Sequence, residues 1–473
     1  MPILSIETQR RAHDGRIDSL LDIRTFCAER NVKDDSTFTS ILNIVLYNLR
    51  PELHPPHLSR ASAFPNSAQE WLHGAVVCAS ILTESITSLS SSCLDPPLDS
   101  SSTPLSTSNC SQMSRYFSTH IWPCIAIVIN WYILDDFQAA ISADVHQESM
   151  NTAVYQLLIH LQKPEVGLQR TMLKKKGIAS SLTRLFLQSL DWSPHPTVAI
   201  AETLAGILLA DIAAAVEEAQ NHPQFLPSLV SHLKHRGKIT SAQLPEMKSV
   251  IHLVRLLLHN SRTLAQRTAA EYPAVLEELM RIWCAQLPVL EKCSFNPATP
   301  EDIQRADMIT HISWSVSCLL QSGGLHTQRQ AVKKHLLQCM LRTNVIFDSL
   351  QSTTTTKQWP STAIWMSYFD IMAALKVRLC FYSLLSPVLR QLQQITSQKL
   401  DDFFSNVAVE DFPEKYFARW FKGMWTEFRQ FAASRESLMA EFKEGLSQRS
   451  TCDAPTVSRL VRFKPQLIHS IDM

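Results

Sequence analysis

The stretch at residues 296–324, NPATPEDIQRADMITHISWSVSCLLQSGG, decides the fold class because it has every feature of one complete helix. Thr299 is a suitable N-cap, Pro300 fits the first helical position, and Asp302 can return a capping-box hydrogen bond. A pair of glycines predicts the end of the helix. Between these signals, apolar residues recur at three- and four-residue steps, namely Ile309, Ile312, Val316, Leu319 and Leu320.

The same periodicity continues along the chain, and few residues interrupt it. The chain has only 10 glycines in 473 residues, whereas glycine makes up about 7% of an average protein and supplies the turns of β-sheet folds. We therefore predict an all-α protein. The predicted helices cover residues 36–49, 67–88, 114–143, 150–161, 195–220, 239–260, 261–290, 296–324, 325–350, 361–385, 387–405, 411–433 and 434–447.

Successive helices with short connections form either a bundle or a stack of helix pairs. One bundle core cannot hold so many helices, and a helix pair takes about 40 residues here, close to the HEAT and armadillo repeat lengths. We predict an irregular α-solenoid of antiparallel helix pairs. Its predicted parts are N-terminal helices (1–87), a Ser/Thr/Pro-rich disordered loop (88–111), a helical array (112–350), a linker (351–360) and C-terminal helices (361–473).

Charge and cysteine content limit the partners and the compartment. The 44 basic and 43 acidic residues leave a net charge of +1, so nucleic acid is not an expected partner. None of the 11 cysteines is spaced as C-x-x-C, which favours reduced core thiols in an intracellular protein, cytoplasmic or nuclear. The N-terminus shows no secretory signal, and the longest apolar run, residues 121–134, is too short to span a membrane.

Two Leu-Asp-Asp-Phe sequences raise the question of a magnesium–diphosphate site in an apolar helical pocket. They contain Asp135 with Asp136, and Asp401 with Asp402. A third acid one helical turn later would be needed on the same face, and neither copy has it. Solvated helix ends are the preferred interpretation, and we predict no cofactor.

Other catalytic and metal-binding motifs are also missing. The chain contains no phosphate-binding glycine loop and no G-x-S-x-G hydrolase motif. His54 with His57, and His232 with His235, are spaced for a shared metal but have no further ligands in sequence, so a loop and a solvated face are expected. Basic residues cluster in three places: Arg170 with Lys174, Lys175 and Lys176; His232 with Lys234, His235, Arg236 and Lys238; and Lys333 with Lys334 and His335.

The predicted helix at 411–433 carries an unusually dense aromatic stripe. Phe417, Phe421, Trp425 and Phe428 form the stripe, Trp420 lies next to it, and charged residues are largely on the other side. These five aromatic residues are the candidate partner-binding residues. Such an amphipathic helix can bind a partner or lie on a membrane surface. More often an aromatic stripe is part of a core, and a helix that closes the end of the core is the preferred interpretation.

Three helical stretches resemble the long helical region of fungal proteins that carry a MYND-type zinc finger. They cover residues 193–219, 309–344 and 359–379. The finger itself needs C-x-x-C pairs, which this sequence does not contain, and Cys452 with His469 cannot replace them. The resemblance therefore implies an armadillo- or HEAT-like helical scaffold without the zinc-dependent peptide recognition of the family.

Two functional hypotheses follow. The first is an intracellular, non-catalytic scaffold that binds one or more proteins. The alternative is an all-α enzyme, or a lipid- or isoprenoid-binding protein, that uses the paired aspartates beside an apolar cavity. Thr103, followed by Pro104, is in addition a candidate phosphorylation site in the Ser/Thr-rich loop.

Overall fold

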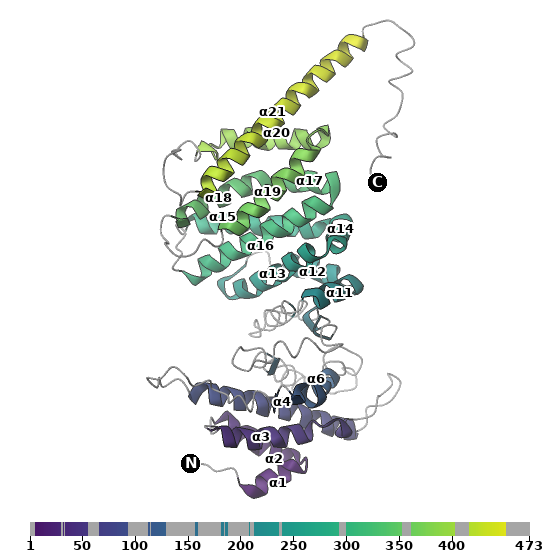
Figure 1. Ribbon diagram of the computed structural model, residues 1–473, viewed down its shortest axis with the longest axis vertical. Coiled ribbons are helices and arrows are strands. Elements are labelled where there is room, and N and C mark those ends of the chain that lie inside the picture. Colours follow the sequence, from purple (N-terminus) through teal and green to yellow (C-terminus); the bar gives the residue numbers. More distant parts are fainter. Residues whose placement is uncertain are drawn as a thin grey trace. The chain divides into compact units, whose positions relative to one another are not determined.

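Every regular element in the described part of the chain is a helix. The computed structural model describes residues 5–29, 32, 34–54, 66–92, 112–113, 115–128, 157–158, 181–183, 185–187, 208, 212–235, 239–292, 299–351, 361–402 and 416–450. The prediction of an all-α protein is confirmed (Figure 1). The α-solenoid arrangement stays a prediction. The chain divides into two units, residues 1–264 and 265–473.

Unit 1 contains the helices of the first half of the chain. They are α1 (Ile6–His13), α2 (Ile17–Ala28), α3 (Asp35–Asn48), the 3-10 turn η1 (Pro51–Leu53), α4 (Asn66–Ser92), the π-helical turn η2 (Phe117–Ile121), α6 (Trp122–Val128), α11 (Ile212–Asn221), α12 (Phe225–His235), the 3-10 turn η4 (Ser241–Gln243) and α13 (Leu244–Asn260). The short α14 (Arg262–Glu271) follows and crosses the boundary between the units.

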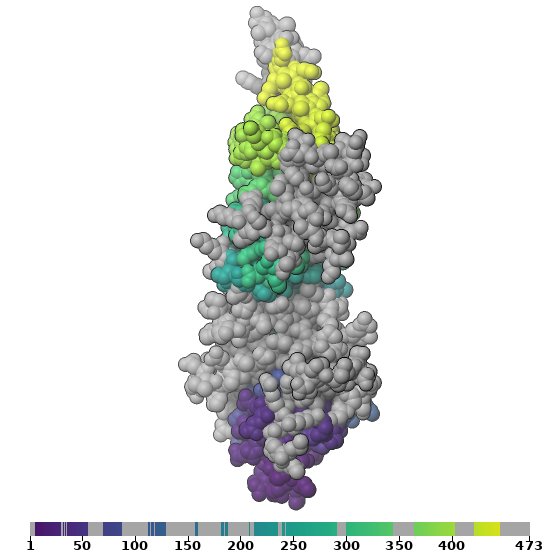
Figure 2. Space-filling model, turned by 90° about the vertical axis from the view of Figure 1, so that its left-hand side faces the viewer, coloured from purple at the N-terminus to yellow at the C-terminus, as the bar shows by residue number. Residues whose placement is uncertain are grey.

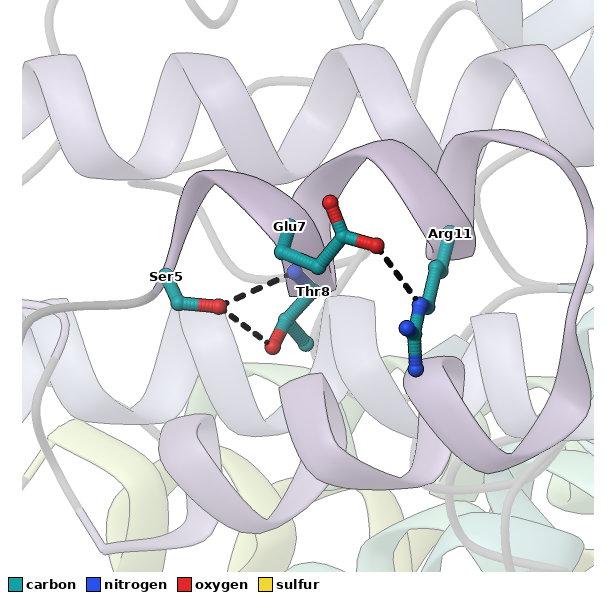
Figure 3. A network of polar contacts seen from close by, with 4 residues as sticks. All are labelled: Ser5, Glu7, Thr8 and Arg11. Atoms are coloured by element: carbon teal, nitrogen blue, oxygen red, sulfur yellow. Dashed lines mark hydrogen bonds and ion pairs between the residues drawn. The ribbon is translucent and has the colours of Figure 1, made fainter.

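The N-terminal helices illustrate how local signals start a helix and distant contacts place it. Ser5 caps α1, since its hydroxyl accepts a hydrogen bond from the Thr8 amide at 3.0 Å, and Glu7 pairs with Arg11 one turn apart at 2.9 Å (Figure 3). The Asn48 amide group donates to the Ala12 carbonyl at 3.0 Å, which fixes the end of α3 against α1.

The described part of unit 2 continues after α14 with seven further helices. They are α15 (Pro273–Lys292), α16 (Pro300–Ser322), α17 (Gly324–Lys333), α18 (Leu336–Gln351), α19 (Ser361–Arg378), α20 (Tyr382–Ser397) and α21 (Tyr416–Ser450). α16 packs against α15 and α19, and α21 packs against α19 and α20 (Figure 1). The core of this unit therefore includes α16, whose five predicted apolar positions are all fully buried.

The start of α16 differs in detail from the prediction. Thr299 is the N-cap residue, but its side chain makes no capping hydrogen bond, so the predicted capping box is wrong. Asp302 is instead buried, with 8% of its surface exposed. The polar residues between the apolar positions are buried as well, among them Thr310, Ser313 and Ser317.

Several predicted boundaries are wrong because turns interrupt a continuous apolar pattern. The predicted helix 261–290 is broken before Pro273, and 325–350 is broken at His335, which has a φ of 66°. The break predicted at residue 386 lies at 379–381, and Pro387 is inside α20.

Two predicted connecting segments begin within helices. α4 continues to Ser92, so the segment 88–111 begins as helix, and residues 93–111, including Thr103, lie outside the described residues. α18 includes Gln351, and the rest of the linker 351–360 also lies outside. Three predicted helices also lie partly outside the described residues: 114–143 from residue 129 on, most of 150–161, and the beginning of 195–220.

Gly323, the C-cap of α16, offers a test of the packing in unit 2. A Cβ atom at this position would lie 2.5 Å from Ala269 Cβ and 2.7 Å from the Leu319 carbonyl oxygen. Gly323→Ala should therefore lower the free energy of unfolding by about 1–3 kcal/mol. Gly423→Ala is the control, because a Cβ atom there meets nothing within 4 Å, and it should stabilise α21 by about 0.5–1 kcal/mol. Denaturant unfolding of the two variants measures both effects. A Gly323→Ala variant that is as stable as wild type would contradict this packing.

Asp34, the N-cap of α3, gives a pH-dependent prediction for unit 1. Hydrogen bonds from Ser36 and Thr37 lower the pKa of Asp34 from 3.8 to about 2. Because the folded-state pKa is below the unfolded value, the stabilisation is complete above pH 3.8 and is lost as the pH falls towards 2. Asp34→Ala should lower the free energy of unfolding by about 1 kcal/mol at neutral pH.

The difference between wild type and Asp34→Ala should then shrink on acidification. Denaturant titrations across this pH range measure it, with Asp34→Asn as the control that keeps a capping oxygen but does not titrate. A difference that stays constant down to about pH 2 would show that the carboxylate does not cap α3.

Candidate functional site

The C-terminal helix α21 is the element that the sequence singled out, and it is one continuous helix of 35 residues, Tyr416–Ser450. The prediction of two helices, 411–433 and 434–447, is wrong, because the sequence Ala432-Ala433-Ser434 contains nothing that ends a helix. Residues 411–415 lie outside the described residues.

The first half of α21 contributes to a row of aromatic rings that crosses three helices of unit 2. Tyr368 of α19 lies 6.3 Å, ring centroid to centroid, from Trp283 of α15 and 5.3 Å from Phe421 of α21. Trp425 and Phe428 continue the row along α21 at 6.3 and 6.2 Å. We call these five side chains the aromatic row. None of them is more than 2% exposed.

This geometry bears directly on the predicted partner-binding residues. Phe421, Trp425 and Phe428 are covered by helices of the same unit, as the core interpretation expected. They cannot contact a partner without leaving the core. Phe417 and Trp420 belong to α21 by their backbone, but their side chains lie outside the described part of the structure. Partner binding by α21 as a helix stays a prediction.

Charged side chains hold the same half of α21 in place. Arg429 forms an ion pair with Asp401, which follows α20, and donates a hydrogen bond to the Thr396 hydroxyl at 3.3 Å. Lys376 of α19 forms an ion pair with Glu427. These contacts fix the rotation of α21, so the aromatic side chains face inwards.

The second half of α21 is different, because its side chains are largely exposed. Leu438 is 50% and Phe442 63% exposed, and the two are one helical turn apart. Tyr382, the first residue of α20, is 53% exposed and has the Lys443 ammonium 4.3 Å above its ring. Figure 2 shows the surface of α21 in yellow beside α20, and Figure 1 shows α21 continuing beyond the neighbouring helices. We call Leu438, Phe442 and Tyr382 the exposed apolar patch.

Of the two aspartate pairs, only Asp401 with Asp402 lies within the described residues. Asp401 is occupied by Arg429 and Asp402 is exposed, whereas Asp135 and Asp136 lie outside the described residues. Within the described ranges, no group of three or more His, Cys, Asp or Glu side chains is arranged to hold a metal ion.

The histidine pairs also differ from expectation. His232 is only 3% exposed and its Nε2 lies 3.6 Å from the Glu246 carboxylate of α13, so the expected solvated face is wrong for this residue. His54 packs edge-on against Trp71 at 5.4 Å, and burial lowers its pKa. His57 and the side chain of His235 lie outside the described residues.

The basic clusters are described only in part. Lys333, Lys334 and His335 lie at the exposed end of α17, where the Lys334 ammonium is 3.6 Å from Glu277. The cluster at 170–176 and residues 236–238 lie outside the described residues. In the part of the chain that is described, no helix is both long and apolar enough to cross a membrane.

Sequence reasoning missed the partners of the aromatic helix. Trp283 and Tyr368 lie within predicted helices, but nothing in their local pattern indicates that they meet Phe421. The exposed apolar patch was missed for a related reason, since Leu438 and Phe442 are spaced as core residues are. Comparison of the chain with protein-family models, with curated proteins and with solved structures finds no match.

Trp425 and Phe442 make a matched pair for testing which half of α21 belongs to the core. Trp425→Ala removes a large, buried ring and should lower the free energy of unfolding by about 3–5 kcal/mol. Phe442→Ala removes an exposed ring and should change it by no more than about 0.5 kcal/mol. Thermal melts of both variants beside wild type measure the effects. A Trp425→Ala melt that coincides with wild type would overturn the core assignment.

Proposed function

We propose that this protein is a non-catalytic protein-interaction scaffold that binds its partner through the exposed apolar patch of α20 and α21. The observation that carries this proposal is the division of α21 into two halves. The aromatic residues of the first half are used by the core, while Leu438 and Phe442 in the second half remain exposed.

The chemistry of the patch suits a protein partner. Large apolar side chains that are at least half exposed and lie near one another are typical of interaction surfaces. A helix that presents apolar residues one turn apart matches helix-in-groove recognition, in which the partner supplies an apolar groove.

The other parts of the proposal rest on the sequence. An intracellular location, cytoplasmic or nuclear, and the absence of a nucleic-acid partner remain predictions from composition. The comparisons do not bear on the resemblance to helical regions of MYND-type proteins, which also remains a prediction. The alternative of an enzyme or isoprenoid-binding protein gains no support from Asp401, because its carboxylate already pairs with Arg429.

The test is a charge substitution within the patch and a matched one outside it. Leu438→Glu combined with Phe442→Glu places two carboxylates in the patch. Ala433→Glu combined with Ala440→Glu adds the same charge at exposed positions on another face of α21. The full-length chain and both variants are purified by affinity from the native cell, and bound proteins are identified by mass spectrometry.

We expect wild type and the Ala433/Ala440 variant to recover the same partner and the Leu438/Phe442 variant to lose it. Melting curves should coincide for all three proteins, since no buried side chain is changed. Recovery of the same proteins by all three chains would contradict the proposal that the patch is the binding surface.

A further inference from the structure

Two cysteines far apart in sequence meet between α15 and α18. The Sγ atoms of Cys284 and Cys339 are 2.7 Å apart, although 55 residues separate them in the chain. A disulfide bond has a length of about 2.05 Å, so only a small movement separates this contact from a covalent bond. Cys339 is 2% exposed, whereas Cys284 is partly open to solvent.

The surroundings keep the two thiols together. The indole nitrogen of Trp283, next to Cys284, donates a hydrogen bond to the Thr343 hydroxyl at 2.9 Å. That hydroxyl in turn donates to the Cys339 carbonyl at 2.7 Å. A hydrogen bond therefore connects α15 to α18 beside the sulfur–sulfur contact, one turn further along α18.

The environment also distinguishes the two sulfur atoms chemically. A hydrogen bond from the Cys339 thiol, together with the nearby Arg342, lowers the pKa of Cys284, while burial acts in the opposite direction. The same hydrogen bond and burial raise the pKa of Cys339 well above its usual value. The thiolate therefore forms at the solvent-accessible sulfur, and the proton stays on the buried one. A thiolate is the nucleophilic form of cysteine.

We propose that Cys284 and Cys339 are a reversible oxidation site at which a peroxide converts the two thiols into an intramolecular disulfide. The Cys284 thiolate attacks one oxygen of hydrogen peroxide, the O–O bond breaks, and Cys284 becomes a sulfenic acid as hydroxide leaves and is protonated to water. Cys339 then attacks the Cys284 sulfur and displaces a second water, which takes up the Cys339 proton. Both sulfurs are oxidised by one electron each, and the peroxide is reduced to two waters.

The bond would join α15 to α18 inside unit 2 and close a long loop of the chain. Such a loop restricts the unfolded chain, so oxidation stabilises the folded unit. Two other buried cysteines, Cys27 and Cys78, have raised pKa values in place of a lowered one. Burial raises the pKa of Cys27 to about 11 and that of Cys78 to about 12, whereas Cys380 is exposed.

Trypsin separates the relevant cysteines into different peptides, which makes the proposal directly testable. Cleavage after Arg281, Lys292, Lys334 and Arg342 gives peptides 282–292 and 335–342, with one cysteine each, and Cys380 lies in peptide 379–390. The full chain is treated with hydrogen peroxide, remaining thiols are blocked with iodoacetamide, and the digest is analysed by mass spectrometry.

We expect the two peptides to appear joined, lighter by two hydrogens than their sum, and to separate on treatment with dithiothreitol. Peptide 379–390, with the exposed Cys380, gives the peroxide dose at which an isolated thiol reacts. The decisive comparison is made at a peroxide dose that already oxidises Cys380. If Cys284 and Cys339 are then still unlinked and carry the iodoacetamide label, the proposal is overturned.

Thermal melts provide an independent measurement. Peroxide should raise the melting temperature of the wild-type chain by about 5 °C or more, and dithiothreitol should reverse the rise. Cys284→Ser should abolish the rise, whereas Cys380→Ser should keep it. A rise that persists in Cys284→Ser would show that another reaction is responsible and would contradict the assignment.

Discussion

Tyr368 packs between Trp283 and Phe421, and through this contact it brings together helices from the beginning, the middle and the end of unit 2. The aromatic rings are large, and their burial removes more apolar surface from water than any aliphatic side chain of the unit can. Burial also raises the pKa of Tyr368 well above its usual value, which keeps the phenol neutral. The position of α21, and hence of everything on its outer face, depends on this row.

α16 shows how the same core accepts polar residues. Thr310 and Ser315 donate hydrogen bonds to the carbonyls of Ala306 and His311 one turn earlier, at 3.0 and 2.9 Å, and Ser313 contacts Ser367 of α19 at 2.8 Å. The buried hydroxyls are thus satisfied within the helix or across the interface. Small side chains also allow α19 to approach closely. A helix that places small hydroxyl side chains between its large apolar ones can therefore lie inside the unit, with neighbours on several sides.

The sequence allowed the existence of most described helices to be predicted, because their apolar residues recur at helical spacing. It did not allow boundaries such as the one at His335 to be predicted, because a left-handed residue between two helices leaves the apolar pattern intact. The expectation of a solvated face was wrong for His232, and the burial of Asp302 was not predicted, because the burial of both residues depends on distant neighbours. For α21 the aromatic stripe was recognised, but tertiary contacts alone decide that Phe421 is covered and Phe442 is exposed.

One continuous helix, α21, belongs to the core in its first half and to the surface in its second half. Hydrogen–deuterium exchange along α21 in the full-length chain tests this most directly, since amide protection reports local opening. Residues 421–432 should exchange as slowly as residues 308–320 of α16, and residues 437–444 should exchange much faster. Uniform exchange along α21, or faster exchange in 421–432 than in 437–444, would contradict the account.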